Sequence, residues 1–125
     1  MKIFLDTADT NIIEKHYTTS LIDGITTNPS LIKKSGRDPE EVYKQLIDLG
    51  IPDVSMEVVG NKEQMLWEGR RLANKFGKNA TIKVPCTPDG LYVCKELSRS
   101  LVKVNVTLIF SVTQAILAAL SLIHI

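Results

Sequence analysis

Short, mainly apolar extended runs alternate five times with longer amphipathic segments along this 125-residue chain. The runs expected to form strands are residues 2–6, 21–28, 53–59, 80–85 and 101–110. The segments expected to form helices are residues 8–18, 29–34, 39–49, 61–76, 88–99 and 111–122. Regular alternation of this kind predicts an α/β domain in which the strands are mainly parallel and the crossovers are right-handed.

Two architectures fit this order of elements. One is an open, doubly wound sheet of five strands, and the other is the N-terminal part of a (β/α)8 TIM barrel with about five βα units. In both architectures the side chains that carry function gather beyond the C-terminal ends of the strands. The residues at those ends are therefore the first candidates for a site.

The composition is that of an ordinary soluble single domain, with 44% hydrophobic and 23% charged residues. The 15 basic and 14 acidic residues are spread along the chain, which argues against a nucleic-acid-binding surface. The N-terminal stretch meets an acidic residue at Asp6, so we expect no signal peptide and a cytoplasmic protein. Cys86 and Cys94 have neither a metal-binding nor a redox spacing, which predicts two free thiols, with a disulfide as the alternative.

The C-terminal segment, residues 104–125, contains no Lys, Arg, Asp or Glu and is long enough to cross a bilayer. Polar residues such as Asn105, Thr107 and Gln114 interrupt it, and its first part alternates like a strand. We therefore expect a strand followed by a buried helix, with no membrane association, and keep a membrane span as the alternative.

Every expected strand carries a polar or ionisable residue at or near its C-terminal end. These residues are Asp6 on the first strand, Thr26, Thr27 and Asn28 on the second, Glu57 on the third, Lys83 on the fourth, and Asn105 and Thr107 on the fifth. Taken singly, each has an ordinary structural explanation, such as a helix cap, a snorkelling lysine or a salt bridge. Because all five strands contribute one, the pattern predicts a shared site.

Lys83 is the residue that suggests a chemistry for this site. It lies between Ile82 and Val84, so if those two pack against helices, Lys83 faces the other side of the sheet, which in a barrel is the lumen. An amine in apolar surroundings has a lowered pKa and can attack a ketone to form an imine. Such a reaction needs a carboxylate to move protons and a water to relay them. Asp6, or Glu57 with Thr107 holding a water, can fill these roles.

Other chemistries find no support in the sequence. No glycine-rich phosphate loop of the dinucleotide-binding or Walker type is present. The two histidines have no partners at metal-ligand spacing. We therefore expect neither a metal nor an organic cofactor.

Five motifs resemble one known family in order along the chain. They are "FLDTAD", "DGITTNPSLI", "VSMEV", "IKVPCTPDGL" and "NVTLIFSVTQAILAA". Together they resemble the small transaldolase family, the short bacterial type related to fructose-6-phosphate aldolase, over residues 1–119. The resemblance implies a (β/α)8 barrel with a lysine Schiff base. It also implies transfer of a dihydroxyacetone unit from a ketose phosphate, sedoheptulose 7-phosphate or fructose 6-phosphate, to an aldose phosphate in the pentose phosphate pathway.

The resemblance also implies a role for each matching residue. Lys83 would form the Schiff base, Asp6 would be the acid and base, Asn28 a polar partner, and Glu57 with Thr107 would hold the catalytic water. Thr27, Asn105 and Ser111 match motif positions expected to bind substrate. Fructose-6-phosphate aldolases resemble this family but carry glutamine at the position of Glu57, so the glutamate favours a transferase. Sugar phosphates are the expected partners, and the full-length family is expected to form homo-oligomers.

The resemblance ends near the C-terminus. The family continues through three more strands, one of which carries a phosphate-binding serine and arginine in a motif like "SPFVGR", and no such motif occurs here. We therefore expect a single, incomplete barrel domain over residues 1–125, with residues 120–125 as a tail unlike the family. The alternatives to a transaldolase are an aldolase that cleaves fructose 6-phosphate, and an inactive barrel fragment that acts only in folding or oligomer contacts.

Overall fold

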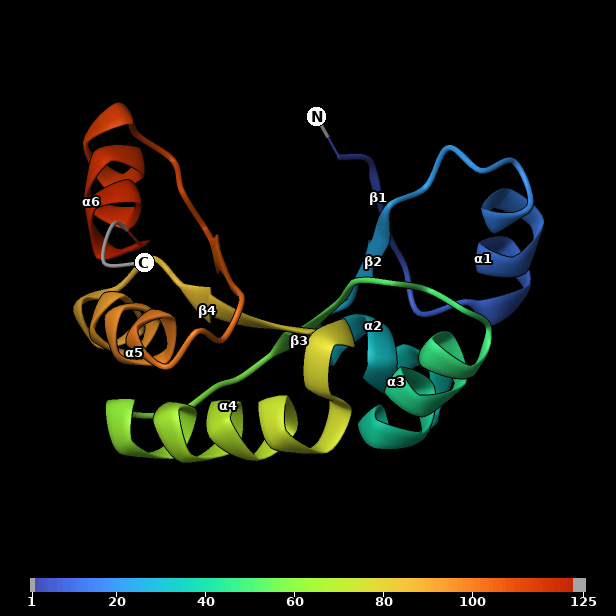
Figure 1. Ribbon diagram of the computed structural model, residues 1–125, viewed down its shortest axis with the longest axis horizontal. Coiled ribbons are helices and arrows are strands. Elements are labelled where there is room, and N and C mark those ends of the chain that lie inside the picture. The colour runs from blue at the N-terminus through green and yellow to red at the C-terminus, as the bar shows by residue number, and fades with distance from the viewer. Residues whose placement is uncertain (1, 123–125) are drawn as a thin grey trace.

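Five parallel strands form one curled sheet in the computed structural model, which describes residues 2–122. The strands are β1 (Phe4–Asp6), β2 (Gly24–Thr26), β3 (Val54–Glu57), β4 (Ala80–Pro85) and β5 (Val104–Thr107), and they pair in the order of the sequence. Figure 1 shows the helices around the outer side of this sheet. The fold is thus the N-terminal part of a (β/α)8 barrel, which is one of the two architectures that the sequence predicts. The doubly wound alternative is wrong, because it needs a reversal of strand order.

Six α-helices connect and follow the strands. They are α1 (Thr10–Tyr17), α2 (Pro29–Ser35), α3 (Pro39–Asp48), α4 (Lys62–Phe76), α5 (Pro88–Arg99) and α6 (Val112–Leu122), with a 3-10 turn, η1, at Gly77–Asn79. The side chain of Asp9 caps α1 by accepting hydrogen bonds from its first turn, and prolines begin α2, α3 and α5. The first, second, third and fifth strands are shorter than expected, because their outer residues belong to the connecting loops.

The hydrophobic core lies between the sheet and the helices. Ile82 and Val84 of β4 and Met56 of β3 are fully buried there, against helical residues such as Leu46 and Leu97. Side chains alternate along a strand, so the residues between them face the opposite, inner side of the sheet. This confirms that Lys83 lies on the other face of the sheet from Ile82 and Val84.

The C-terminal helix α6 differs from expectation, because it is largely exposed rather than buried. It packs on α5 along one side and buries only Ala118, whereas Ile116, Leu117 and Leu120 are each about half exposed. No described residue covers its other face. No helix within residues 2–122 is both long and apolar enough to cross a membrane, so the membrane-span alternative has no support in this part of the chain.

The two cysteines are unpaired, as their spacing predicts. Cys94 lies on the buried side of α5, and this burial raises the pKa of its thiol. Cys86 follows β4 and is partly exposed. The disulfide alternative is therefore wrong for this fold.

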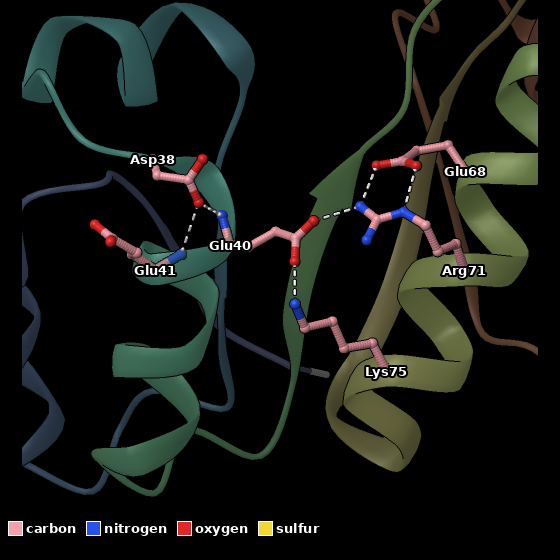
Figure 2. Close-up of polar contacts among 6 residues, drawn as sticks. All are labelled: Asp38, Glu40, Glu41, Glu68, Arg71 and Lys75. Atoms are coloured by element: carbon pink, nitrogen blue, oxygen red, sulfur yellow. Dashed lines mark hydrogen bonds and ion pairs between the residues drawn. The ribbon is translucent and has the colours of Figure 1, made fainter.

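An ion-pair network joins α3 to α4 on the outer surface (Figure 2). Glu40 of α3 pairs with both Arg71 and Lys75 of α4, and Arg71 also forms a two-pronged pair with Glu68. Hydrogen bonds from Arg71 and then Lys75 hold the pKa of the Glu40 carboxyl below its usual value. The network therefore fixes the orientation of two neighbouring helices outside the core.

We expect Glu40→Gln to lower the free energy of unfolding by roughly 0.5–1 kcal/mol at neutral pH, the range of partly exposed ion pairs. Because the folded pKa of Glu40 is depressed, this contribution is present above the unfolded pKa of about 4.3 and disappears as the pH falls through the folded value. Urea titrations of the wild type and the variant at pH 7 and pH 3 should show the difference shrinking at low pH. A difference that stays constant would contradict the electrostatic origin.

Candidate active site

The amine of Lys83 is held on the inner face of the sheet by two neighbouring strands. Its Nζ donates a hydrogen bond of 2.9 Å to the carbonyl oxygen of Thr27, just after β2. The same atom lies 3.2 Å from Oε2 of Glu57 on β3, and the two side chains are only 10% and 16% exposed. The lysine is therefore neither a surface residue nor an edge residue, but a buried amine with one carboxylate partner.

The register of the sheet explains why these groups meet. Glu57, Lys83 and Asn105 are lateral neighbours on β3, β4 and β5, so their side chains leave the same face at one level. Nδ2 of Asn105 donates a 3.3 Å hydrogen bond to the hydroxyl of Ser55, one layer below Glu57. The inner face is thus polar at this level, whereas the outer face is entirely apolar.

An open cleft of about 580 Å³ lies above this layer, at the C-terminal ends of the strands. Five of the residues expected to carry chemistry line it, together with three others: Asp6, Asn28, Pro29, Ser30, Glu57, Lys83, Thr107 and Leu108. The lining residues come from β1, β3, β4 and β5, from the residues directly after β2 and β5, and from the first turn of α2. Five of the side chains predicted to converge from the strand ends therefore do line one cleft.

Asp6 has a hydrogen-bond partner in Thr26, which is one of the polar strand-end residues but has no role implied by the resemblance. The hydroxyl of Thr26 donates a 3.1 Å bond to Oδ1 of Asp6, its direct neighbour across the β1–β2 pair. The bond leaves the second carboxylate oxygen available to a ligand. The sequence already placed Thr26 at the end of the second strand, the position at which the other cleft residues also lie.

Asn28 combines a structural role with a place in the cleft. Its Oδ1 accepts a 2.9 Å hydrogen bond from the amide of Leu31 and so caps α2. Its Nδ2 donates to no atom of the described residues, so it remains free for an oxygen of a ligand. The cap fixes the orientation of the amide, which makes this donor a rigid one.

Three of the eight expected site residues do not line the cleft, namely Thr27, Asn105 and Ser111. Thr27 is fully buried and its hydroxyl donates to the carbonyl oxygen of Ser55 at 3.2 Å, so only its own carbonyl meets Lys83. Ser111 is exposed and its hydroxyl accepts a 3.2 Å bond from the amide of Gln114 in the first turn of α6. Asn105 lies between these cases, beside Lys83 but below the cleft lining.

This arrangement suits chemistry in which an amine attacks an electrophile and protons move nearby. The Lys83 nitrogen and the Glu57 carboxylate are within proton-transfer distance. A second carboxylate, Asp6, faces the same cleft from β1. No cluster of three or more His, Cys, Asp or Glu side chains suited to a metal occurs among residues 2–122.

Comparisons with known proteins agree with the motifs. A family model described as Transaldolase/Fructose-6-phosphate aldolase matches residues 3–124. A "Probable transaldolase" of Nitrosopumilus maritimus is 49% identical over 97% of this chain and 54% of its own length. Proteins of the same name from Paracoccus denitrificans and Geobacter metallireducens are 53% and 48% identical, each over 95% of this chain and 55% or 56% of their own length. The chain spans about half the length of the curated relatives that it matches.

Proposed function

Because this chain belongs to the transaldolase/fructose-6-phosphate aldolase family, we propose that it carries the Schiff-base site of a transaldolase. The reaction would move a dihydroxyacetone unit from a ketose phosphate, sedoheptulose 7-phosphate or fructose 6-phosphate, to an aldose phosphate. One observation carries the proposal: the buried amine of Lys83 opens onto a cleft that two carboxylates also line. A cytoplasmic role in the pentose phosphate pathway is part of the same proposal and rests on the resemblance.

The first half of the reaction begins at Lys83. Its ammonium gives a proton to Glu57, 3.2 Å away, and the neutral nitrogen attacks the ketone carbon of the donor to form a carbinolamine. The hydroxyl of the carbinolamine then takes back the proton held by Glu57 and leaves as water, which gives a protonated imine. Asn28 supplies a fixed donor for a substrate hydroxyl at the rim of the cleft.

The second half breaks and remakes a carbon–carbon bond. Asp6 removes the proton from the C4 hydroxyl of the donor, the bond between C3 and C4 breaks, and its electrons pass to the imine nitrogen. The aldose leaves, and the three-carbon enamine attacks the aldehyde carbon of the acceptor, whose oxygen recovers the proton from Asp6. A water held between Glu57 and Thr107 finally hydrolyses the imine and frees Lys83.

An aldolase is the second candidate, since the family description includes both activities. The two differ in what releases the enamine. A transaldolase needs an aldose acceptor for turnover, whereas an aldolase hydrolyses its imine and sets free dihydroxyacetone. Glu57 favours the transferase through the resemblance, so we expect product from fructose 6-phosphate only when an acceptor is present, as a coupled assay can show.

Borohydride trapping tests the proposal directly. We expect the chain, incubated with fructose 6-phosphate and reduced, to gain one covalent adduct that peptide mapping places on Lys83. Lys103 offers a matched control, because it also lies next to the sheet but is 43% exposed and pairs with Asp53 instead. An unmodified Lys83 in a chain shown to be folded would reject the catalytic role and leave the inactive-fragment alternative.

A further inference from the structure

A basin separate from the cleft lies between α2 and the loop that joins β1 to α1. Its volume of about 350 Å³ is within the range of small-molecule sites. The basin borders the cleft, because Asp6 lines the cleft and the next residue, Thr7, lines the basin. Its polar lining residues are Thr7, Asp9, Thr10, Lys34, Ser35 and Arg37. The resemblance implies no role for any of these six.

Two cationic side chains line the basin, and neither has a carboxylate partner. Lys34 and Arg37 form no ion pair with any acidic side chain in the part of the chain that the structure describes. By contrast, Lys83, Arg71 and Arg99 each have such a partner. An anion in the basin would therefore meet two positive charges that the described chain leaves uncompensated.

The guanidinium of Arg37 is held in place from the neighbouring helix. Its Nη2 donates a hydrogen bond to Oε1 of Gln45 on α3, and the residue is only partly exposed. Gly36 ends α2 with a φ of 68°, so the chain turns sharply between the two cations. A guanidinium has further N–H donors in a planar fork that matches the oxygens of a phosphate. Arg37 therefore offers an oriented fork, whereas Lys34 offers a mobile point charge.

The acidic residue of the lining, Asp9, is committed to the start of α1. Its Oδ1 accepts hydrogen bonds from the amides of Asn11 and Ile12, where the helix dipole offsets part of its charge. The hydroxyl oxygen of Thr7 accepts a 3.1 Å bond from the amide of Asp9, which leaves the hydroxyl proton of Thr7 for a ligand. Two cations against one committed carboxylate give the basin a net positive charge.

We propose that this basin binds a phosphate monoester, with the phosphate group between Lys34 and Arg37. The fork of Arg37 donates to two phosphate oxygens, and the ammonium of Lys34 donates to the third. A phosphate carries nearly two negative charges at neutral pH, which matches the two cations better than a carboxylate does. Solvent reaches both cations, so we expect a dissociation constant of about 1 mM. Binding here is independent of the chemistry at Lys83.

Titration with inorganic phosphate, followed in two-dimensional amide NMR spectra, tests the site. We expect the amides of residues 7–10 and 34–37 to shift and to saturate at millimolar phosphate, while chloride at the same ionic strength leaves them in place. Lys34→Gln and Arg37→Gln should each weaken binding about tenfold, because each removes one charged hydrogen-bond donor. Shifts that do not saturate, or that are equally large around the other surface lysines, would overturn the proposal.

Lys33→Gln is the matched control for Lys34→Gln. Lys33 lies in the same last turn of α2 and is also exposed, but it does not line the basin. Both variants remove one charge from the same helix end, so the net charge and the interaction with the helix dipole change alike. We expect Lys33→Gln to weaken phosphate binding less than about twofold. An equal loss in the two variants would show general attraction to a basic surface and would contradict a built site.

Borohydride trapping then shows whether the phosphate and the reacting ketone belong to one molecule, an experiment that rests on the proposed function. Dihydroxyacetone carries the ketone without a phosphate. If one sugar phosphate reaches both places, Lys34→Gln lowers the adduct yield with fructose 6-phosphate and leaves the yield with dihydroxyacetone unchanged. If a separate phosphate monoester occupies the basin, both yields match the wild type. A wild type without an adduct from either ketone would reject the Schiff base at Lys83, while the phosphate titration would still decide the basin.

Discussion

The Lys83→Ala variant is expected to lose the trapped adduct completely and to lose at least about 10³-fold in any dihydroxyacetone transfer that the wild type shows. The reason is that the reaction proceeds through a bond to this nitrogen, which no other group in the cleft can replace. Lys83 is the only lysine among the residues that line the cleft. Lys2 and Lys103 both pair with Asp53, which precedes β3 at the opposite end of the strands.

The controls for this variant follow from its burial. Removing Lys83 leaves the largely buried Glu57 without its cation, so some loss of stability is expected and must be measured separately by circular dichroism and urea titration. Lys83→Met keeps the length and the apolar stem of the side chain and should retain more stability while remaining equally inactive. Lys103→Ala should keep the adduct. An adduct that persists in Lys83→Ala, on whatever lysine, would remove Lys83 from the mechanism.

The sequence was sufficient for the fold and for most of the cleft because both depend on simple periodicities. Ile82 and Val84 alternate with Lys83, and the structure buries the first two against helices and turns the lysine to the inner face. Parallel strands bring their C-terminal ends to one edge of a sheet. This is why Asp6 and Thr107, distant in the sequence, line the same cleft as Lys83.

The parts that differ from expectation depend on contacts that no local pattern encodes. Thr27 follows a strand that ends one residue earlier, so its side chain turns into the body of the protein and bonds to Ser55. Ser111 lies beyond a loop whose residue Leu108 has a positive φ of 62°, and this loop separates it from the cleft. The apolar character of α6 predicted burial, yet burial needs a neighbouring element, and α5 covers only one side.

Gly90→Ala is expected to cost about 3 kcal/mol in the free energy of unfolding, a large effect for the addition of one methyl group. Gly90 lies in the first turn of α5, directly beneath the end of β4. A β-carbon at this position would overlap the carbonyl oxygen of Pro85, deep inside van der Waals contact. That carbonyl cannot move freely, because it accepts a 2.9 Å hydrogen bond from the amide of Thr87, while the Thr87 hydroxyl caps Gly90 itself.

Gly36→Ala provides the matched comparison for this collision. Gly36 ends α2 with a φ of 68°, but no atom lies near its missing side chain, so alanine there suffers only backbone strain of about 1 kcal/mol. Urea titrations of both variants should therefore separate steric overlap from conformational strain, and equal losses would contradict the overlap. Pro85 is two residues beyond Lys83 and is the register partner of the cleft residue Thr107 on the neighbouring strand β5. The displaced carbonyl of Gly90→Ala should therefore also reduce the yield of trapped adduct in the fraction that remains folded, whereas Gly36→Ala should leave that yield unchanged.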